Sequence, residues 1–459
     1  MEYLYKIYYK NKDAYEDTYK SRINFEETLK TELFIRPLKD NIENQLYFVY
    51  NRETLDLIDR VTQNDYKLEK LNDRLPGVAE KAFILDLISS ELKSTNDLEG
   101  IESDKDEIIE TTRNIINEKK PDQERLISMI KSYLLLIERD ALSLPIDLKD
   151  IRKIYDEITF GEIEESDEPD GKYFRTQAVY VQKKNTVSGE IIHEGVKGEK
   201  NIEGALKKLL NFLRKSEIDL LIRIAIGHYY FGYIHPFYDG NGRVNRFISS
   251  MFIRSKYNYL TSMALARGSW IERTYYYKAF DRTNSKINKG ELNYFIDEFL
   301  RILISGQEDI IFNLTDKIEK LDRAKGTVDE EKEIIDSELK KKIIFLLTQN
   351  YYFDKNSGLS RDEIYELTRE VKNKSRKIKE LRDLQDDGFI KAIKERPLIY
   401  VLDRKFIEKL WFKNSSTKRR GLSSMEFFYF WKIFKFKFIK IILEGRIKAK
   451  CLNLFKNFL

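Results

Sequence analysis

The sequence predicts a mainly α-helical protein that carries one short β-hairpin and a smaller domain of helices and a hairpin near its C-terminus. Apolar residues recur at helical spacing along most of the 459 residues. Only 20 glycines and 7 prolines interrupt that spacing. The apolar share of 42% is enough for sizeable cores, and the length predicts two to three domains.

The first 75 residues are predicted to form an N-terminal extension. Two runs in it, Tyr3–Tyr9 and Leu46–Tyr50, mix aromatic and polar residues in a way that favours strands. Helical periodicity then spans Glu53–Leu75 and ends at the Pro76-Gly77 pair.

A second helix is predicted at Val78–Leu98, and its last turn combines a hydroxyl, a carboxylate and a glycine. Thr95 and Glu99 lie four residues apart and therefore share one helix face. Gly100 follows as a helix stop. Taken alone, this ending is typical of a solvated helix terminus.

A β-hairpin is predicted at about residues 175–194. Helical segments between residues 114 and 160 and an acidic surface loop at 161–171 precede it. The outgoing strand is expected at Phe174–Val181, and the returning strand contains Ile191, Ile192, His193 and Glu194. We expect His193 at the surface.

Twelve residues, His235–Arg246, read HPFYDGNGRVNR, a mixture that few structural needs explain. The helical pattern of Glu217–Tyr233 leads into His235, and Pro236 ends it. His228 lies seven residues before His235 on the same helix, and we expect it to be a hydrogen-bonded core residue.

The run from Gly240 to Gly242 tolerates left-handed backbone conformations, which turn successive N–H groups toward one point. A helix resumes at Val244–Lys256, so this turn opens onto a helix N-terminus that favours phosphate. Arg243 and Arg246 are three residues apart, and their forked donors match the oxygens of a polyphosphate.

Two neighbouring side chains complete this chemistry. Asp239 is placed to hold Mg2+ against the phosphates, because that ion prefers a carboxylate together with substrate oxygens. An ordinary imidazole titrates near pH ~6.5, so His235 is a residue type that accepts a proton from a hydroxyl at neutral pH. A base beside a metal-bound polyphosphate indicates nucleotidyl or phosphoryl transfer to an alcohol.

The whole run resembles the signature of the Fic (filamentation induced by cAMP) family, HPFx(D/E)GNGRxxR, and matches it at every fixed position. The resemblance implies a helical Fic core and AMPylation, which transfers AMP from ATP to a Tyr, Ser or Thr hydroxyl of a target protein and releases pyrophosphate. ATP as the substrate and Mg2+ are the implied cofactors. In the related Doc toxins, which phosphorylate, lysine replaces the second glycine, so Gly242 favours AMP transfer.

The resemblance gives each residue of the run a role. His235 would deprotonate the incoming hydroxyl, Asp239 would ligate Mg2+, and Phe237 would anchor the loop in the core. The phosphates would be held by Gly240, Asn241, Gly242, Arg243 and Arg246.

Three other stretches also resemble parts of this family. Thr95, Glu99 and Gly100 match its inhibitory motif, (S/T)xxxE(G/N), which implies that Glu99 pairs with Arg246 and denies it to the γ phosphate. The hairpin at 175–194 resembles the flap, which aligns the target segment by strand pairing. An RxxYY run and a following asparagine would close over the adenine and ribose, through Arg273, Tyr276, Tyr277 and Asn284.

The catalytic domain is predicted at residues 76–321, with its inhibitory helix at 78–100 and a long amphipathic helix at Gly290–Lys320 that closes it. A charged linker is predicted at 322–336. The order of helices and a hairpin at 337–412 resembles a winged helix-turn-helix domain.

The predicted recognition helix of that domain is basic. Its positive residues are Lys372, Lys374, Arg376, Lys377, Lys379 and Arg382. Acidic neighbours dilute the field, namely Glu380, Asp383, Asp386 and Asp387. DNA binding therefore stays open beside target docking and domain packing.

Residues 413–459 form a basic aromatic tail with a net charge of +10, whereas the first 412 residues carry −5. Lysines interrupt its apolar stretch, so a spanning helix is not expected; a surface helix on a membrane or nucleic acid and an atypical extension both stay open. Cys451 is the only cysteine of the sequence, which excludes a disulfide within the chain and a cysteine-rich zinc site. The N-terminus lacks the uninterrupted apolar core of a secretory signal, which predicts a cytoplasmic protein.

Two alternatives to AMPylation stay open. The same site would support removal of AMP, with Glu99 positioning water, or transfer of another phosphate-containing group. The second alternative is a non-enzymatic regulator that binds DNA or a partner protein and whose nucleotide site is sensory or silent. Self-modification and a homodimer are open as well.

Overall fold

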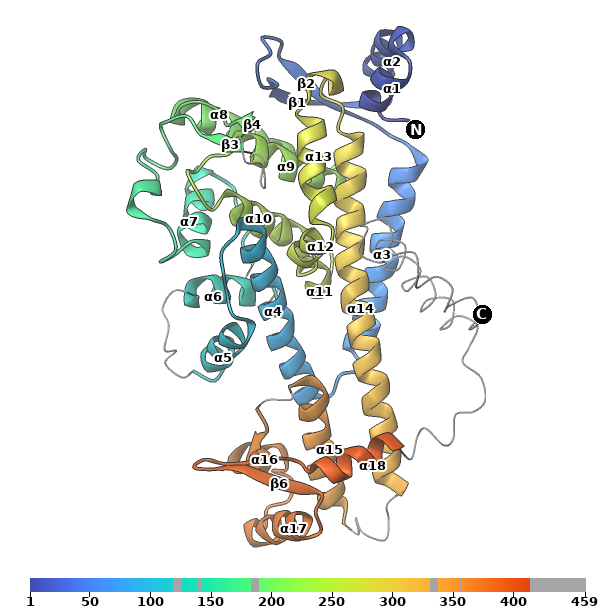
Figure 1. Cartoon of the computed structure of the whole chain (residues 1–459), viewed down its shortest axis with the longest axis vertical. Helices are drawn as coiled ribbons and strands as arrows, with labels where there is room; N and C mark the ends of the chain where they lie inside the picture. The colour runs from blue at the N-terminus through green and yellow to red at the C-terminus, as the bar shows by residue number, and fades with distance from the viewer. Residues whose placement is uncertain (119–125, 139–141, 183–189, 331–336, 355–356, 413–459) are drawn as a thin grey trace, which may run out of the picture. The chain divides into compact units, whose positions relative to one another are not determined.

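The computed structural model describes residues 1–118, 126–138, 142–182, 190–330, 337–354 and 357–412. The predicted mainly α-helical fold is confirmed, and the strands in these ranges form three small sheets (Figure 1). The chain divides into two compact units, 1–322 with 348–358 and 323–347 with the residues from 359 on. None of the helices in the described ranges combines the length and the apolarity needed to cross a membrane.

The N-terminal extension consists of two helices and a hairpin: α1 (Leu4–Lys10), α2 (Lys12–Asn24), β1 (Thr28–Ile35) and β2 (Asn44–Val49). The strand predicted at Leu46–Tyr50 is confirmed, but the strand predicted at Tyr3–Tyr9 is wrong. That segment is helical because its aromatic residues pack around Tyr294 of the first unit. The Tyr3 hydroxyl also donates to Asp297 across 2.9 Å.

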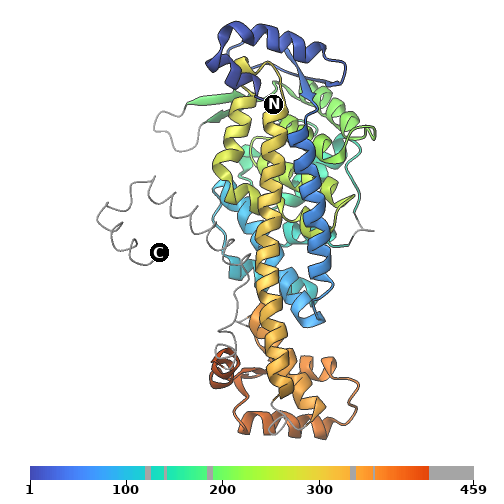
Figure 2. The same cartoon turned by 90° about the vertical axis from the view of Figure 1, so that its right-hand side faces the viewer.

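Helices α3 (Arg52–Asn72) and α4 (Gly77–Glu99) follow the predicted bounds closely. α3 lies beside the long helix α14 (Asn293–Glu330) (Figure 2). The Gln307 side chain donates to the carbonyl of Val61 across 3.1 Å and ties these two helices together.

Three helices lead to the predicted flap: α5 (Lys105–Ile116), α6 (Ile127–Leu135) and α7 (Leu148–Ile158). The flap is an antiparallel pair, β3 (Tyr180–Gln182) and β4 (Ile191–Glu194). Its predicted outgoing strand is too long, because Phe174 is fully buried and the side chain of Arg175 binds backbone carbonyls. The turn predicted at 183–189 lies outside the described residues.

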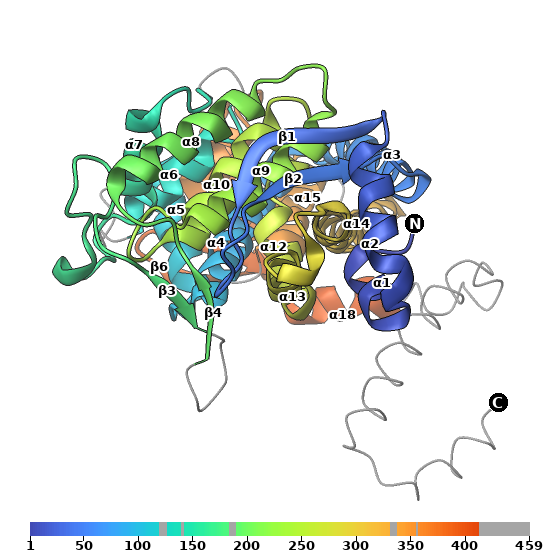
Figure 3. The ribbon, with the colours of Figure 1, turned by 90° about the horizontal axis from the view of Figure 1, so that it is seen from above.

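The centre of the first unit is built from α8 (Glu199–Leu213), α9 (Leu220–Ile234) and α10 (Asn241–Arg254), followed by α11 (Tyr259–Ser262), α12 (Leu265–Ile271) and α13 (Arg273–Thr283). α8, α9 and α10 lie side by side (Figure 3). Nearly every residue of α9 is buried, so this helix forms the core that positions both its neighbours.

The segment predicted as a linker at 322–336 is helical as far as Glu330, because α14 continues through it. Ala324 and Val328 are each 2% exposed, so the apolar stripe of this helix continues into the second unit.

The helices and the hairpin predicted between residues 337 and 402 are present as α15 (Glu338–Phe353), α16 (Arg361–Leu367), α17 (Lys374–Asp386), β6 (Ile390–Glu395) and β7 (Leu398–Leu402). Two elements were not predicted, β5 (Leu359–Ser360) and α18 (Arg404–Phe412). Residues 348–353 of α15 belong to the first unit, and the other elements belong to the second. Ser360 caps α16 in a capping box with Glu363. The strand order is β5-β7-β6 with antiparallel pairs. The tail at 413–459 lies outside the described residues.

Two glycines allow α12 and α14 to cross closely. A Cβ atom on Gly306 would overlap the carbonyl of Ala264, and one on Gly268 would overlap the carbonyl of Ile302. Because both obstacles are backbone atoms, neither is able to rotate away.

We predict that Gly306→Ala lowers the free energy of unfolding by roughly 1–3 kcal/mol through overpacking. Gly204→Ala in α8 is the matched control, since no atom lies within 4 Å of the added Cβ. The control should stabilise the protein by up to about 1 kcal/mol. Denaturant unfolding followed by circular dichroism measures both, and equal stability of the two variants would contradict the close crossing.

Candidate active site

Helix α9 delivers His235 to the site. The helix ends at Ile234, and His235 is its C-cap in a left-handed conformation with φ of 51°. The backbone N–H of His235 still donates to Phe231 across 3.0 Å. This conformation costs a non-glycine residue roughly 1–2 kcal/mol, so the surrounding contacts must hold it.

The loop after His235 is fixed by an aromatic stack and by one amide side chain. Phe237 is fully buried and stacks on Tyr155 with 3.8 Å between ring centroids, so it anchors the loop. The Asn241 side chain accepts from the N–H of Phe237 at 2.9 Å and donates to its carbonyl at 2.8 Å. These bonds use both the oxygen and the nitrogen of the Asn241 side-chain amide, so the loop is closed on both sides of Phe237.

The predicted phosphate cradle is the N-terminus of α10. Gly240 is left-handed with φ of 76°, but Asn241 and Gly242 already belong to the first helical turn. Of these three residues only Gly240 adopts a left-handed conformation, because the bonds from the Asn241 side chain start the helix one residue after Gly240. The first N–H groups of α10 have no intrahelical acceptor and form a positive helix end.

Arg243 is buried in the first turn of α10 and is paired with a carboxylate that the sequence did not reveal. Its Nη1 donates to Glu162, whose side chain is 4% exposed. Glu162 lies in the segment predicted as a surface loop, and no pattern in the sequence distinguishes it from the acidic residues around it. Arg243 Nη2 lies 3.9 Å from Asp239, and among the described residues Nε has no hydrogen-bond partner.

Arg246 is 1% exposed and contacts the end of α4. Its Nη2 donates to Glu99 across 2.6 Å and to the carbonyl of Thr95 across 3.1 Å, while Nε donates to the Thr95 hydroxyl across 2.8 Å. A Cβ atom on Gly242 would overlap the Glu99 carboxylate, so this glycine leaves room for it. Burial alone would lower the pKa of Arg246, but the charge of Glu99 raises it above its usual range.

Two features hold α4 in this position. Glu91 is buried, and its two oxygens accept the N–H groups of Ala266 at 2.8 Å and Arg267 at 2.9 Å. Gly100 ends the helix in a left-handed conformation with φ of 81°. The role of Glu91 is not evident from the sequence, because it looks like any polar residue of an amphipathic helix.

The residues predicted to bind the nucleoside all make contacts within the protein. Tyr276 is 6% exposed and hydrogen-bonds to His228 across 2.9 Å. The Tyr277 hydroxyl donates to the carbonyl of Leu98 across 2.7 Å, and the Asn284 side chain accepts from Tyr229 across 2.7 Å.

His228 is the hydrogen-bonded core residue that the sequence predicts. In addition to its bond with Tyr276, it bonds the Ser249 hydroxyl at 2.8 Å. His193 differs from its expected surface position. It is 6% exposed, because its Nε2 bonds the carbonyl of Tyr233 at 2.7 Å. In the same strand Ile191 is 43% exposed, Ile192 is half-buried, and Glu194 pairs with Lys197 at 2.9 Å.

The environment keeps His235 neutral. Burial lowers the pKa of His235 to about 4, and the nearby His193 and the positive charge of Arg175 act in the same direction. A hydrogen bond to the backbone of Gly232 acts in the opposite direction. The ring donates in that bond, so its other nitrogen is an acceptor at neutral pH.

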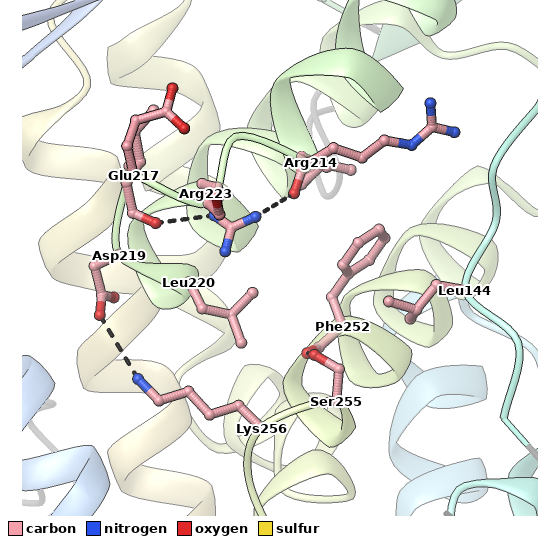
Figure 4. Close-up of a pocket in the computed structure, with 12 residues that line it drawn as sticks. Leu144, Arg214, Glu217, Asp219, Leu220, Arg223, Phe252, Ser255 and Lys256 are labelled. Atoms are coloured by element: carbon pink, nitrogen blue, oxygen red, sulfur yellow. Dashed lines mark hydrogen bonds and ion pairs between the residues drawn. The ribbon is translucent and has the colours of Figure 1, made fainter. Parts of the chain in front are cut away.

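A cavity of about 590 Å3 opens at the other end of α9, between Leu220 and Phe252 (Figure 4). Arg223 there donates to backbone carbonyls, and Lys256 lies 3.9 Å from Asp219. His235 follows the last residue of α9, so the 15 residues of this helix separate the cavity from the histidine by about 22 Å. The cavity is therefore separate from the candidate active site.

Comparison with known proteins identifies the central part of the chain. Residues 145–253, which include the loop from His235 to Arg246, match the model of the Fic/DOC family. These residues form a Fic domain. The family is known for AMPylation or related nucleotide transfer, and its members act on protein targets.

Solved structures similar to this chain include three Fic proteins. A Fic family protein from Desulfovibrio desulfuricans G20 is 14% identical, with 78% of this chain and 97% of that chain covered and a TM-score of 0.45. A fragment of Fic-1 from C. elegans is 18% identical, with coverages of 58% and 74% and a TM-score of 0.38. A Fic domain containing signaling protein from Bacteroides thetaiotaomicron VPI-5482 is 15% identical, with coverages of 56% and 97% and a TM-score of 0.38.

We predict that Asn241→Asp loosens the catalytic loop, because a carboxylate accepts from Phe237 but is unable to donate to its carbonyl. The loss in the free energy of unfolding should be about 1–3 kcal/mol, as for a buried group left without its partner. Asp239→Asn is the control, since the exposed side chain of Asp239 makes no hydrogen bonds to the backbone of Phe237. Equal unfolding curves for both variants would refute the assignment of Asn241 as the loop closure.

Proposed function

We propose that the Fic domain transfers AMP from ATP to a hydroxyl side chain of a target protein. The observation that carries this proposal is the neutral imidazole of His235, held beside a positive helix end whose first two turns bury Arg243 and Arg246. Fic domain proteins are generally transferases, which agrees with this chemistry.

The reaction requires one proton acceptor and a site for the leaving group. The target hydroxyl loses its proton to the free ring nitrogen of His235 while its oxygen attacks the α phosphorus of ATP. The bond from that phosphorus to the bridging oxygen breaks, and pyrophosphate leaves. The N-terminus of α10 and its two arginines would stabilise the negative charge of the leaving group.

Asp239 fits the role of a Mg2+ ligand. Its side chain is 53% exposed and lies at the start of the phosphate site, 3.9 Å from Arg243. The described residues contain no group of three or more His, Cys, Asp or Glu side chains suited to a metal, so phosphate oxygens would have to complete the coordination. When bound, the ion would neutralise phosphate charge.

Glu99 supports a resting state of the same site. Its carboxylate occupies Arg246, the residue that the family resemblance assigns to the γ phosphate. A polyphosphate at this arginine would therefore have to displace Glu99. Removal of AMP, transfer of another phosphate-containing group, and self-modification are outcomes that the same experiment distinguishes.

We predict that Glu99→Gly raises AMP incorporation, because Arg246 becomes available to the nucleotide. ATP labelled at the α position and ATP labelled at the γ position, each incubated with a lysate, provide the measurement. Label from the α position alone is expected. His235→Ala in the Glu99→Gly background should abolish transfer, since the proton acceptor is lost.

Asp97→Gly is the matched control for that experiment, because it introduces glycine into the same helical turn while its carboxylate pairs with Lys93 at 3.1 Å. It should leave the rate at the parent level. An equal increase in both glycine variants would show that helix fraying, and not release of Arg246, activates the protein. No α label in any variant would refute the transferase proposal and favour a nucleotide sensor.

A second candidate function concerns the second unit, for which we propose binding to the backbone of duplex DNA. Glu380 is 9% exposed and Asp383 is partly buried, and both lie 4.0 Å from Lys340. These carboxylates therefore dilute the positive surface of α17 less than the sequence indicates. The exposed basic residues of α17 and the preceding loop are Lys372, Lys374, Arg376, Lys379 and Arg382.

The neighbouring strand extends this surface. β6 contacts α17, and Lys391, Lys394 and the following Arg396 are all exposed. Lys377 does not contribute, because it is 7% exposed and donates to the carbonyl of Tyr365 at 2.9 Å. Its expected place on a recognition surface is therefore wrong.

We predict that Lys379→Glu with Arg382→Glu weakens binding to duplex DNA roughly tenfold or more and reduces its salt dependence. Fluorescence anisotropy with a labelled duplex, titrated at about 50 mM and about 200 mM salt, measures both effects. Lys405→Glu with Arg404→Glu on α18 changes the charge equally and is the control. An unmodified protein that fails to bind the duplex at low salt would refute the proposal.

A further inference from the structure

Arg175 is a buried cation whose hydrogen bonds all go to backbone. Its side chain is fully buried, and burial lowers its pKa, whereas Tyr238 and Asp170 act in the opposite direction. Nε donates to the carbonyl of His235 at 2.8 Å, and Nη2 donates to those of Val196 at 2.9 Å and Ile234 at 3.4 Å. Nη1 donates to the carbonyl of Gln177.

These four acceptors belong to three separate segments. Gln177 precedes β3, Val196 follows β4, and the other two carbonyls belong to the end of α9 and to its C-cap. Backbone bonds reinforce the junction, since Arg175 donates its N–H to Pro236 at 3.2 Å and Val196 donates to Ile234 at 3.1 Å. A single guanidinium therefore joins both ends of the flap to the backbone that carries the imidazole.

The end of α9 needs such a donor. The last carbonyls of a helix have no intrahelical partner, and a cation at this end interacts favourably with the helix dipole. His235 is left-handed at this point, so the chain turns away from α9 just where Arg175 binds. The guanidinium thus satisfies the carbonyls that this turn exposes to the interior.

Gly195 makes the close approach of the three segments possible. A Cβ atom there would collide with Nη2 of Arg175 and lie 3.1 Å from Cβ of His235 and 3.2 Å from the carbonyl of Ile234. Any larger residue would push the flap away from the base or displace the guanidinium.

We propose that Arg175 is a positioning residue that fixes the His235 base and the flap to each other, so that a strand-paired target hydroxyl meets the imidazole at a constant place. This inference rests on the proposed transfer of AMP. It differs from the roles of the signature loop, because Arg175 touches neither the phosphate site nor the ring of His235 by any hydrogen bond in the described structure.

The positive charge of Arg175 has a second, measurable effect. Burial is the main cause of the lowered pKa of His235, and the nearby His193 and the charge of Arg175 lower it further, whereas Glu99 raises it. Losing the guanidinium removes its charge. The pKa of His235 should then rise, and the acid limb of the pH profile should move to higher pH.

The test compares Arg175→Met with Arg175→Lys, both in the Glu99→Gly background. Arg175→Met should lower kcat for AMP transfer roughly 10- to 100-fold with little change in the KM for ATP, because the base and the flap lose their common position. Arg175→Lys keeps the charge but not the fork, so it should lower kcat while leaving the acid limb where it is. Lys200→Met, an exposed cation at the start of α8, should match the parent.

A second readout does not depend on activity. The chain has only three histidines, so NMR titration of labelled imidazoles, assigned by single substitutions, gives the pKa of His235 directly. The pKa of His235 should rise in Arg175→Met and remain at the parent value in Arg175→Lys. If Arg175→Met does not fold, Gly195→Ala serves instead, with the same fall in kcat expected.

An unchanged kcat in Arg175→Met, corrected for the folded fraction, together with an unchanged pKa of His235 would overturn the inference. A melting temperature that falls while kcat per folded molecule holds would also overturn it, because the role would then be structural only. If the Glu99→Gly parent itself transfers no AMP, the proposed function fails, and the NMR titration still decides whether Arg175 controls His235.

Discussion

The buried guanidinium of Arg246 is the constraint on which the rest of the site depends. A charge that is 1% exposed requires hydrogen-bond acceptors or an anion from the protein, because water is not able to compensate it there. Glu99 provides that anion at 2.6 Å, and the hydroxyl and carbonyl of Thr95 take further donors of the same side chain. The end of α4 is thereby tied to α10. Glu91, one helical turn before Thr95, fixes the same helix to α12. Under the proposed function, a polyphosphate would compete with Glu99 for this arginine.

The loop between α9 and α10 is held independently of that pair. Phe237 stacks on Tyr155, Asn241 closes the loop onto the backbone of Phe237, and Arg175 binds the carbonyl of His235. None of these contacts involves Glu99 or Arg246, so the geometry of the loop does not depend on that pair. The coupling between Glu99 and the base is electrostatic, because the charge of Glu99 raises the pKa of His235.

The sequence predicted the features that consecutive residues encode. Helical periodicity located α3, α4 and α9, and α16 begins at a local capping box between Ser360 and Glu363. It failed where distant residues decide. Tyr3–Tyr9 looks like a strand by composition, but its partners lie almost 300 residues away in the first turns of α14. His193 became a core residue through the carbonyl of Tyr233, and neither Glu162 nor Arg175 differs in sequence from an ordinary charged surface residue.

Glu162 and Glu99 pair with Arg243 and Arg246 of α10 in different ways, and the two arginines therefore differ in the donors that they offer to a phosphate. Glu162 binds Nη1 of Arg243 only; Nε has no hydrogen-bond partner among the described residues, and Nη2 reaches only Asp239, at 3.9 Å. Arg243 therefore retains donors for a phosphate while its ion pair stays intact, so Glu162 orients this side chain without blocking it. In Arg246, Nε donates to Thr95, and Nη2 donates to both Thr95 and Glu99. Under the proposed function, a polyphosphate would therefore compete with Glu99 for Nη2 of Arg246, whereas Arg243 would offer it Nε beside an intact ion pair.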